Sequence, residues 1–460
     1  VGMTRYAAGD YDGAILSFSH ALSQTVEPMR ALDQSVVYFY RGNACYYKSD
    51  YDQAIADYSQ AIRLKPSLAE AYYNRGLAYL AKGDYDRAIT DFNQTIKLKP
   101  NLAEAYYNRG VACVHKGKHD RAIADFNQAI RLKPNLAEAY MSRGVAYLAK
   151  GDYNQAIADF NQAITLKPDF AEAYNNRGLA YAHKGDYDRA INDYNQAIKL
   201  KPDHADVYNN RGAAYVDKGD YDRAIVDFDQ AIKLKPDLAE AYFNRGLAYA
   251  HKGDYDQAIA DFDRAINLKP DYANAYYNRG NAYADKGDYD RAIADYNQAI
   301  RIRPDFAEAY NNRGLAYSHK GDYDRAIADF NHAVRLKPDS AEVYYNRGLV
   351  YAYKGAYDRA IADFGQAIML KPNFAEAYNN RGLAYAQKGA YGRAIADFNQ
   401  AIRLRPDFAE AYNNRGLAYA HKGDYDRAIA DFNQAIRLKT YFAEAYYNRG
   451  PVSYTHLRAH

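Results

Sequence analysis

The chain has 460 residues, of which 25% are charged, and its net charge at pH 7 is +3. Basic and acidic residues are interleaved along it and form no basic patch, so we expect no nucleic-acid partner. No apolar run approaches the roughly 20 residues that cross a bilayer, so we expect no membrane segment.

One unit of 34 residues recurs along almost the whole sequence. Residues 69–102, AEAYYNRGLAYLAKGDYDRAITDFNQTIKLKPNL, are a representative copy. A strict period of this length is typical of stacked supersecondary units, which build a long surface and no single pocket. We therefore predict one elongated array of about twelve units in residues 35–450. The glycine that marks each unit occurs at Gly42, Gly76, Gly110, Gly144, Gly178, Gly212, Gly246, Gly280, Gly314, Gly348, Gly382, Gly416 and Gly450.

The first 34 residues contain part of a further unit. Gly2 precedes Gly9 by the spacing found inside the full units, which places the start of the chain within a helix. Six extra residues, around positions 25–34, separate this part from the next unit. We interpret them as a lengthened second helix or as a loop containing Pro28. Residues 1–34 are therefore predicted to be a partial unit with an extended linker.

Each unit is predicted to begin its first helix with a capping box. Asn101 and Glu104 have the required spacing: the Asn side chain accepts from free N–H groups of the first turn, and the Glu side chain reaches back. Asn274 breaks this pattern in one unit, where it takes the place of the Glu. The same spacing recurs at Ser67/Glu70, Asp169/Glu172, Asp237/Glu240 and Asp305/Glu308.

A glycine is predicted to end the first helix, and an aspartate to cap the second. Gly117, which tolerates positive φ, follows the first helix of its unit. In most units the next residue is Asp, as in Gly83-Asp84, and we expect it to cap the second helix. The second helix of residues 101–134 then reads DRAIADFNQAI and stops before Pro134.

Both helices are amphipathic. Tyr72, Gly76 and Tyr79 share one face of the first helix, and Ala88 and Phe92 share one face of the second. The small residues let the two helices approach closely, and we expect the aromatic residues to fill the space around this contact. Each pair alone buries little surface, so the stack of pairs forms the core.

The sequence resembles the tetratricopeptide repeat family over residues 2–450. The resemblance rests on an aromatic residue four before the glycine, Tyr three after it, Ala twelve after it, Phe or Tyr sixteen after it, and a closing Pro. It implies an all-α fold, an α-solenoid of antiparallel helix pairs that forms a right-handed superhelix. It also implies a concave face lined by the first helices.

The residue before the glycine departs from the family pattern, because it is Arg in every register from Arg41 to Arg449. A buried charge without a partner is very costly. An Asp recurs with the same period, from Asp57 and Asp91 to Asp431. We predict that these Arg and Asp residues pair, within a repeat or between neighbours. Alternatively, each Arg stem covers apolar surface while its charged head stays in water.

An asparagine stands two residues before the glycine in nearly every repeat. An amide carries donors and an acceptor, so a ladder of amides along the concave face can grip an extended peptide backbone. The pattern is similar to the asparagine ladder of O-linked N-acetylglucosamine transferase. Alternatively, the amides solvate an exposed helix face or bond within the repeat. The predicted peptide-binding residues are Asn74, Asn108, Asn176, Asn210, Asn244, Asn278, Asn312, Asn346, Asn380 and Asn414, and Asn448 continues the register.

Two variable series flank this register. The residue before each ladder asparagine varies, as in Tyr73, Met141 and Asn175, and we expect it to supply specificity. The residue five after the glycine is often His. The first four histidines of this series lie two repeats apart, about 20 Å at helix packing distances of about 10 Å. They are therefore too far apart to share a metal ion, and we expect surface or groove histidines. The same spacing rules out a disulfide between Cys45 and Cys113.

The sequence contains no catalytic motif and predicts no cofactor or metal. The main hypothesis is a non-catalytic scaffold that binds protein or extended peptide segments in its groove. The alternative is the substrate-recruiting arm of a larger enzyme, such as a glycosyltransferase or a kinase. A third possibility is self-association through ends that lack capping helices. The cellular compartment stays open.

The last residues, 451–460, have no repeat character. VSYTHLRAH resembles the translated end of a sequencing adapter, so we predict that this tail is non-native, with a genuine short tail as the alternative. Since Val1 is not a start Met, we expect a fragment of a longer protein.

Overall fold

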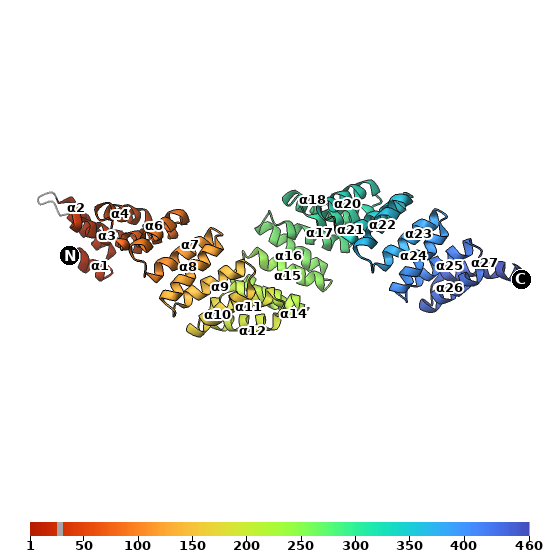
Figure 1. The fold of residues 1–460 in the computed structure, drawn as a ribbon, viewed down its shortest axis with the longest axis horizontal. Coiled ribbons are helices and arrows are strands. Elements are labelled where there is room, and N and C mark those ends of the chain that lie inside the picture. Colours follow the sequence, from red (N-terminus) through yellow and green to blue (C-terminus); the bar gives the residue numbers. More distant parts are fainter. Residues whose placement is uncertain (25–30, 460) are drawn as a thin grey trace. The chain divides into compact units, whose positions relative to one another are not determined.

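The computed structural model describes residues 1–24 and 31–459, and the side chains of residues 1–24 and 33–453. All regular elements in this part of the chain are α-helices, and they alternate as the first and second helices of successive repeats (Figure 1). The first helices are α1 (Gly2–Ala7), α3 (Ala31–Tyr47), α5 (Ala69–Ala81), α7 (Ala103–His115), α9 (Ala137–Ala149), α11 (Ala171–His183), α13 (Ala205–Asp217), α15 (Ala239–His251), α17 (Ala273–Asp285), α19 (Ala307–His319), α21 (Ala341–Tyr353), α23 (Ala375–Gln387), α25 (Ala409–His421) and α27 (Ala443–Ala459).

The second helices follow the first ones after short turns. They are α2 (Tyr11–Ser23), α4 (Tyr51–Leu64), α6 (Tyr85–Leu98), α8 (His119–Leu132), α10 (Tyr153–Leu166), α12 (Tyr187–Leu200), α14 (Tyr221–Leu234), α16 (Tyr255–Leu268), α18 (Tyr289–Ile302), α20 (Tyr323–Leu336), α22 (Tyr357–Leu370), α24 (Tyr391–Leu404) and α26 (Tyr425–Leu438). None of the described helices has the length and apolar character needed to cross a membrane.

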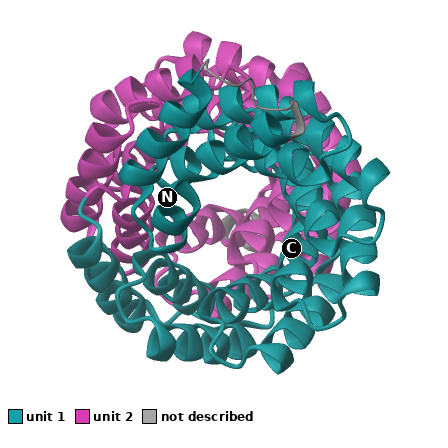
Figure 2. Ribbon diagram, turned by 90° about the vertical axis from the view of Figure 1, so that its left-hand side faces the viewer, with its two compact units in different colours: residues 1–236 teal, residues 237–460 magenta. Residues whose placement is uncertain are grey.

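The chain divides into two compact units, Val1–Pro236 and Asp237–His460, and each is a curved stack of helix pairs (Figure 2). Within each unit, first helices of neighbouring repeats contact one another, as α5 contacts α7 and α17 contacts α19. Second helices of neighbouring repeats make no such contacts in the described residues. The first helices therefore lie on the inner side of the curve. The predicted all-α solenoid of antiparallel helix pairs is confirmed.

A glycine in the left-handed region follows each of the described first helices except α3 and α27. Gly83 has φ of 77°, and its N–H donates to the carbonyl of Leu80 at 3.0 Å. The N–H of Asp84 donates to the carbonyl of Tyr79 at 2.9 Å. These two bonds satisfy carbonyls that the helix end leaves free. The predicted glycine ends are confirmed, and Ser49, with φ of 62°, takes this place after α3.

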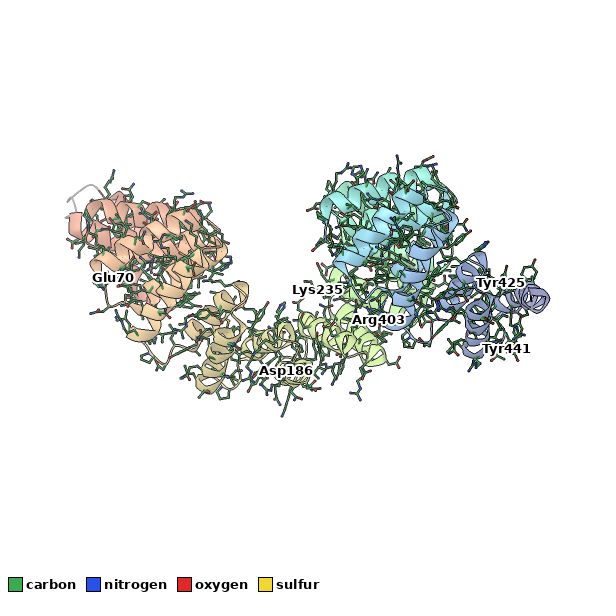
Figure 3. The ribbon with its side chains drawn as sticks, turned by 45° about the vertical axis from the view of Figure 1, so that its right-hand side comes forward. Glu70, Asp186, Lys235, Arg403, Tyr425 and Tyr441 are labelled. Carbon is green, nitrogen blue, oxygen red and sulfur yellow. The ribbon has the colours of Figure 1, made fainter. Side chains whose placement is uncertain are left out.

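An aspartate caps most of the second helices, as predicted. The Asp84 side chain accepts from the backbone N–H of Arg87 at 3.1 Å. Asp186, labelled in Figure 3, accepts from Arg189 at 3.3 Å in the same way. Four second helices begin after a residue whose side chain makes no such bond, namely Lys118, Asp254, Ala356 and Ala390.

The predicted capping boxes of the first helices are wrong. The N-cap of α7 is Leu102, without a side-chain cap bond, so the helix begins one residue later than expected. The N–H of Leu102 donates to the carbonyl of Lys99 at 3.3 Å, which closes a β-turn with Pro100 and Asn101 at its centre. Proline and Asn favour these central positions because of their backbone conformations. The turn therefore takes the Asn that the sequence pattern assigned to the helix cap.

The glutamates of the expected capping boxes bind a basic residue at the end of the second helix instead. Glu104 pairs with Lys133 at 3.1 Å, and Glu410 pairs with Lys439 at 2.9 Å. Correspondingly, Lys439 lowers the pKa of the Glu410 carboxyl. These pairs tie the two helices of one repeat together near the turn that leads to the next repeat.

The core of each repeat is the contact between the glycine and the aromatic residue sixteen positions later. Phe92 and Ala88 have no exposed surface, and a Cβ added to Gly76 would lie 2.7 Å from Phe92 Cε1. The predicted close approach of the two helices is therefore confirmed.

Two sequence predictions concern the ends of the array. Helix α2 ends at Ser23 and α3 begins at Ala31. Of the residues around 25–34 that are predicted to form a lengthened helix or loop, residues 25–30 lie outside the described residues and residues 31–34 belong to α3. Helix α27 continues through Pro451. The interpretation of residues 451–460 as a non-native tail stays a prediction.

Candidate functional site

The recurring arginines and aspartates pair within each repeat. Arg75 donates from Nε to Asp91 Oδ2 at 2.7 Å and from Nη2 to Oδ1 at 2.8 Å. The same two-point pair recurs from Arg41–Asp57 to Arg415–Asp431, with Asp side chains only 2% to 10% exposed. Two parallel charge-assisted bonds fix both the distance and the orientation of the two helices. The predicted Arg–Asp pairing is confirmed, and it serves the scaffold.

Most of these arginines also contact the preceding repeat. Arg109 Nη1 donates to Asn93 Oδ1 of α6 at 2.7 Å, while its guanidinium lies 5.5 Å from the centre of the Tyr106 ring. Sequence reasoning missed the Asn partner. The pattern that could have indicated this partner is an Asn that stands seventeen residues after most of the repeat glycines. Arg381 is an exception, because Gly365 stands where the Asn is expected.

The ladder asparagines lie on the first helices, and most of their amide nitrogens hold the preceding repeat, whereas Asn278 Nδ2 donates to the Asn274 carbonyl of its own helix at 2.8 Å. Asn108 Nδ2 donates to Tyr73 Oη at 2.9 Å. Asn346 Nδ2 donates to Asn311 Oδ1 at 3.1 Å. Part of most of these amides therefore serves the packing between repeats, whereas the alternative prediction was a bond within the repeat. Equivalent bonds join Asn210 to Asn175, Asn380 to Tyr345, Asn414 to Asn379 and Asn448 to Asn413.

The amide oxygens of the ladder are less engaged than its nitrogens. Asn312 Oδ1 accepts from Asn311 Nδ2 at 3.0 Å, and Asn380 Oδ1 accepts from Asn379 Nδ2 at 3.3 Å. An oxygen without a donor in the chain is free to accept from another molecule. Among the described residues, no donor reaches the Oδ1 atoms of Asn108, Asn176, Asn210 and Asn414.

The variable residue before each ladder asparagine lies in the contact between repeats. The Tyr73 ring packs against Phe92, with centroids 6.0 Å apart, and burial raises the pKa of Tyr73 to about 12. Its hydroxyl is therefore neutral at physiological pH and can accept from Asn108. Asn311, Asn379 and Asn413 in this slot are buried. Much of the variation at this slot thus changes the side chain that accepts a hydrogen bond from the ladder asparagine of the next repeat.

The histidines five residues after the glycine stack on the preceding repeat. His115 lies parallel to Tyr85 with centroids 4.7 Å apart, and His319 lies parallel to Tyr289 at 4.8 Å. In the part of the chain that the structure describes, no three His, Cys, Asp or Glu side chains are grouped to hold a metal. Cys45 and Cys113 are buried and free, as predicted.

A polar cluster interrupts the apolar packing on the inner face of unit Asp237–His460. Asn281 Oδ1 accepts from Tyr296 Oη and from Asn312 Nδ2, both at 2.9 Å, and Asn312 also donates to Tyr277 Oη at 2.9 Å. Sequence reasoning missed this cluster. Its signal was an Asn directly after the glycine, combined with Tyr sixteen after it, which recurs only at Gly42.

Asn312 lies between two hollows. One, of about 540 Å³, lies between α17, α18 and α19 and is lined by Asn281, Asp285, Tyr289 and His319. The other, of about 310 Å³, lies between α19 and α21 and is lined by residues including Glu308, Asn311 and Lys337. A third hollow, of about 330 Å³, lies near the end of the chain and is lined by residues including Tyr425, which Figure 3 labels.

Comparison with known protein families matches the repeats along the chain. A family described as TPR repeat matches residues 42–83 and, in overlapping segments, residues 212–423. Families described as tetratricopeptide repeat match residues 76–137, 141–205, 193–226 and 409–439. The chain belongs to the tetratricopeptide repeat (TPR) family.

Several solved TPR-like structures are similar to this TPR chain. The APC/C hetero-tetramer Cut9–Hcn1 is 16% identical over 98% of this chain and 95% of that chain, with a TM-score of 0.47. MamA is 35% identical over 36% of this chain and 96% of that chain, with a TM-score of 0.34. Yeast Tom70 is 17% identical over 92% of this chain and 96% of that chain, with a TM-score of 0.40. A search of curated protein sequences found no match.

The inner face of the TPR array thus presents amide oxygens that accept no bond from the chain and, beside Asn312, two polar hollows. Its buried Arg–Asp pairs and Gly–aromatic contacts are already satisfied by one another, so they belong to the framework. TPR arrays of this kind act as protein-interaction scaffolds, and the side chains that remain available lie on the first helices.

Proposed function

We propose that this TPR array is a non-catalytic scaffold that binds an extended segment of a partner protein along the inner face of its first helices. The observation that carries the proposal is the row of ladder Oδ1 atoms that accept no bond from the chain. Each can accept from a peptide N–H whatever the peptide side chain is. The ladder therefore recognises a backbone, while the hollows beside it recognise side chains.

The spacing of the ladder suits an extended peptide. Packed helices lie about 10 Å apart, and an extended chain rises about 3.3 Å per residue. One ladder oxygen would thus meet about every third residue of the peptide. In this proposal the predicted binding residues Asn108, Asn176, Asn210 and Asn414 hold the preceding repeat with their amide nitrogens and the partner with their oxygens.

The test starts from a display library of unstructured peptides, selected on the immobilised full chain. Affinities of the selected peptides are then measured by fluorescence polarisation for two triple variants. The first variant, N108A/N176A/N210A, removes the three ladder Oδ1 atoms of unit Val1–Pro236 that accept no bond from the chain.

The matched control removes the same contacts between repeats but keeps the ladder oxygens. It changes the partners of the three amide nitrogens. It is Y73F/M141L/N175A.

We expect the first variant to bind at least about tenfold more weakly, since three hydrogen bonds of about 1 kcal/mol each are lost. The control should stay within about threefold of the wild type, and circular dichroism should show equal helix content in all three proteins. An equal loss in both variants would show that the ladder is structural only. Failure to select any peptide would contradict the proposed function itself.

The recruiting-arm alternative and self-association through the ends stay predictions. Tyr441 and Tyr447 are 95% and 78% exposed near the end of unit Asp237–His460 (Figure 3 labels Tyr441). Light scattering over a range of concentrations distinguishes a monomer from a self-associating array.

A further inference from the structure

The hollow between α17, α18 and α19 has an unusual lining for this protein. Its volume of about 540 Å³ falls in the range of sites that take a small ligand or a side chain. Leu315 and small alanines form its apolar wall, and Tyr289 with His319 stacked on it forms an aromatic wall. Asp285 is the one charged residue among those that line it, apart from the titratable ring of His319.

The Asp285 carboxylate has no cation of its own. The basic residues around it bind other acids: Lys286 pairs with Asp256, and Arg291 pairs with Asp288. Arg279 pairs with Asp295 at 2.6 Å. Within the described residues, no Lys or Arg reaches Asp285. Its negative charge is therefore uncompensated at the mouth of a hollow that is open to solvent.

The Asn281 amide adds a donor to this acceptor. Its Oδ1 is occupied by two bonds, from Tyr296 and from Asn312, which fix the orientation of the amide. Burial raises the pKa of Tyr296, so the phenol stays protonated and keeps its role as a donor. An amide nitrogen carries two donors, so Asn281 Nδ2, which lies beside the Tyr277 hydroxyl, can also donate to a carbonyl of a bound molecule.

We propose that this hollow is a specificity pocket for one basic side chain, Arg or Lys, of the bound peptide. The cation pairs with Asp285, the stem of the side chain lies against Leu315 and the alanines, and a peptide carbonyl accepts from Asn281 Nδ2. The inference rests on the proposed function, since it assigns a side-chain preference to a peptide on the inner face.

Unit Val1–Pro236 contains a natural counterpart that lacks the pocket. Asn43 there accepts from Tyr58 Oη at 2.9 Å and from Asn74 Nδ2 at 2.8 Å, as Asn281 does in the other unit. However, Tyr46 and Tyr47 stand where α17 has Ala284 and Asp285. The hollow is reduced to about 100 Å³ and has no carboxylate. The polar cluster of Asn, Tyr and Asn side chains can therefore form even where tyrosines fill most of the hollow.

The experiment uses the peptides selected on the full chain and two variants of the pocket. D285N removes the charge and keeps the size of the side chain. A284Y fills the hollow with the residue that the chain uses at the equivalent position, Tyr46. D217N is the matched control, because Asp217 occupies the same slot of α13, where no Asn follows the glycine.

We expect the selected peptides to share a basic residue at one position. Their affinity should fall about fivefold with D285N, corresponding to about 1 kcal/mol for a partly exposed pair. It should fall further with A284Y, and D217N should leave it unchanged. Replacing the basic residue of the peptide with Gln should remove the difference between wild type and D285N.

Two outcomes overturn the inference. If peptides are selected without a shared basic residue, or if D285N and D217N bind them equally, the pocket does not select a basic side chain. The scaffold proposal still stands in that case. If no peptide is selected at all, the proposed function fails together with the pocket.

Discussion

Arg75 holds Asp91 through two parallel hydrogen bonds, of 2.7 Å from Nε and 2.8 Å from Nη2, between the two helices of one repeat. Removing one partner leaves a charge that is largely withdrawn from water. We predict that D91A destabilises α5 and α6 by about 3 kcal/mol. Native-state hydrogen exchange of these helices measures the loss. D52A, which breaks the exposed Lys82–Asp52 pair, should change little.

The close helix contact predicts opposite effects of two Gly→Ala substitutions. A Cβ at Gly110 would lie 2.7 Å from Phe126 Cε1, so G110A should cost about 1–3 kcal/mol through overpacking. Gly392 lies inside α24, and a Cβ added there would meet no atom within 4 Å, so G392A should stabilise that helix by about 0.5–1 kcal/mol. Thermal unfolding of both variants checks the signs, and a destabilising G392A would contradict the expected gain in helix propensity.

Ser49 is a non-glycine residue in the left-handed region, with φ of 62°. A side chain in this conformation costs about 1 kcal/mol. We therefore expect S49G to slow hydrogen exchange in α3 and α4. The reverse change, G83S, should accelerate exchange in α5 and α6 by a similar factor, because Gly83 occupies the equivalent turn of the next repeat. Equal exchange rates in S49G and wild type would show that the turn holds no strain.

Arg381 lacks the contact that its counterparts make with the preceding repeat. A Cβ at Gly365 would lie 3.7 Å from Arg381 Nη1, which leaves room for an Asn. We predict that G365N stabilises α22 by about 1 kcal/mol, through better helix propensity and a new bond to Arg381. The measurement is hydrogen exchange of α22. N331G removes the 2.7 Å bond to Arg347 and should have the opposite effect on α20.

The Glu–Lys pairs predict a dependence of stability on pH. Lys99 lowers the pKa of Glu70, and Lys439 lowers that of Glu410, from an ordinary value of 4.5. A lowered pKa means that the folded state binds fewer protons than the unfolded state. The stabilisation is therefore complete above the unfolded pKa and is lost as the pH falls through the folded pKa.

The melting temperature of the wild type should accordingly fall between about pH 5 and about pH 3, and that of E70Q/E410Q should fall less. E342Q is the control, since Glu342 at the same slot of α21 makes no ion pair in the described structure. If the double variant and E342Q have the same pH profile as the wild type, these pairs contribute nothing measurable.

The family assignment and the framework could be predicted from the sequence because they depend on local spacing. Gly76 and Phe92 lie sixteen residues apart in a unit of two short helices, which allows only one way of packing them together. Arg75 and Asp91 recur with the same period, so their pairing could also be inferred. The helix starts could not, because the Pro100-Asn101 turn and a capping box make competing use of the same Asn.

The sequence by itself determined the repeat, its helices and the glycine turns, since each follows from residues close together in one unit. It predicted that Arg and Asp pair, and the structure decided that they do so within one repeat. Only the tertiary structure decided which atom of a ladder amide bonds within the chain and which stays available to a partner. Asn108 donates to Tyr73 of the preceding repeat and leaves its oxygen without a donor from the chain. Likewise, only the stacking of α17 on α19 brings Asp285 and His319 around one hollow. Contacts between repeats depend on curvature, which no spacing within a single unit specifies.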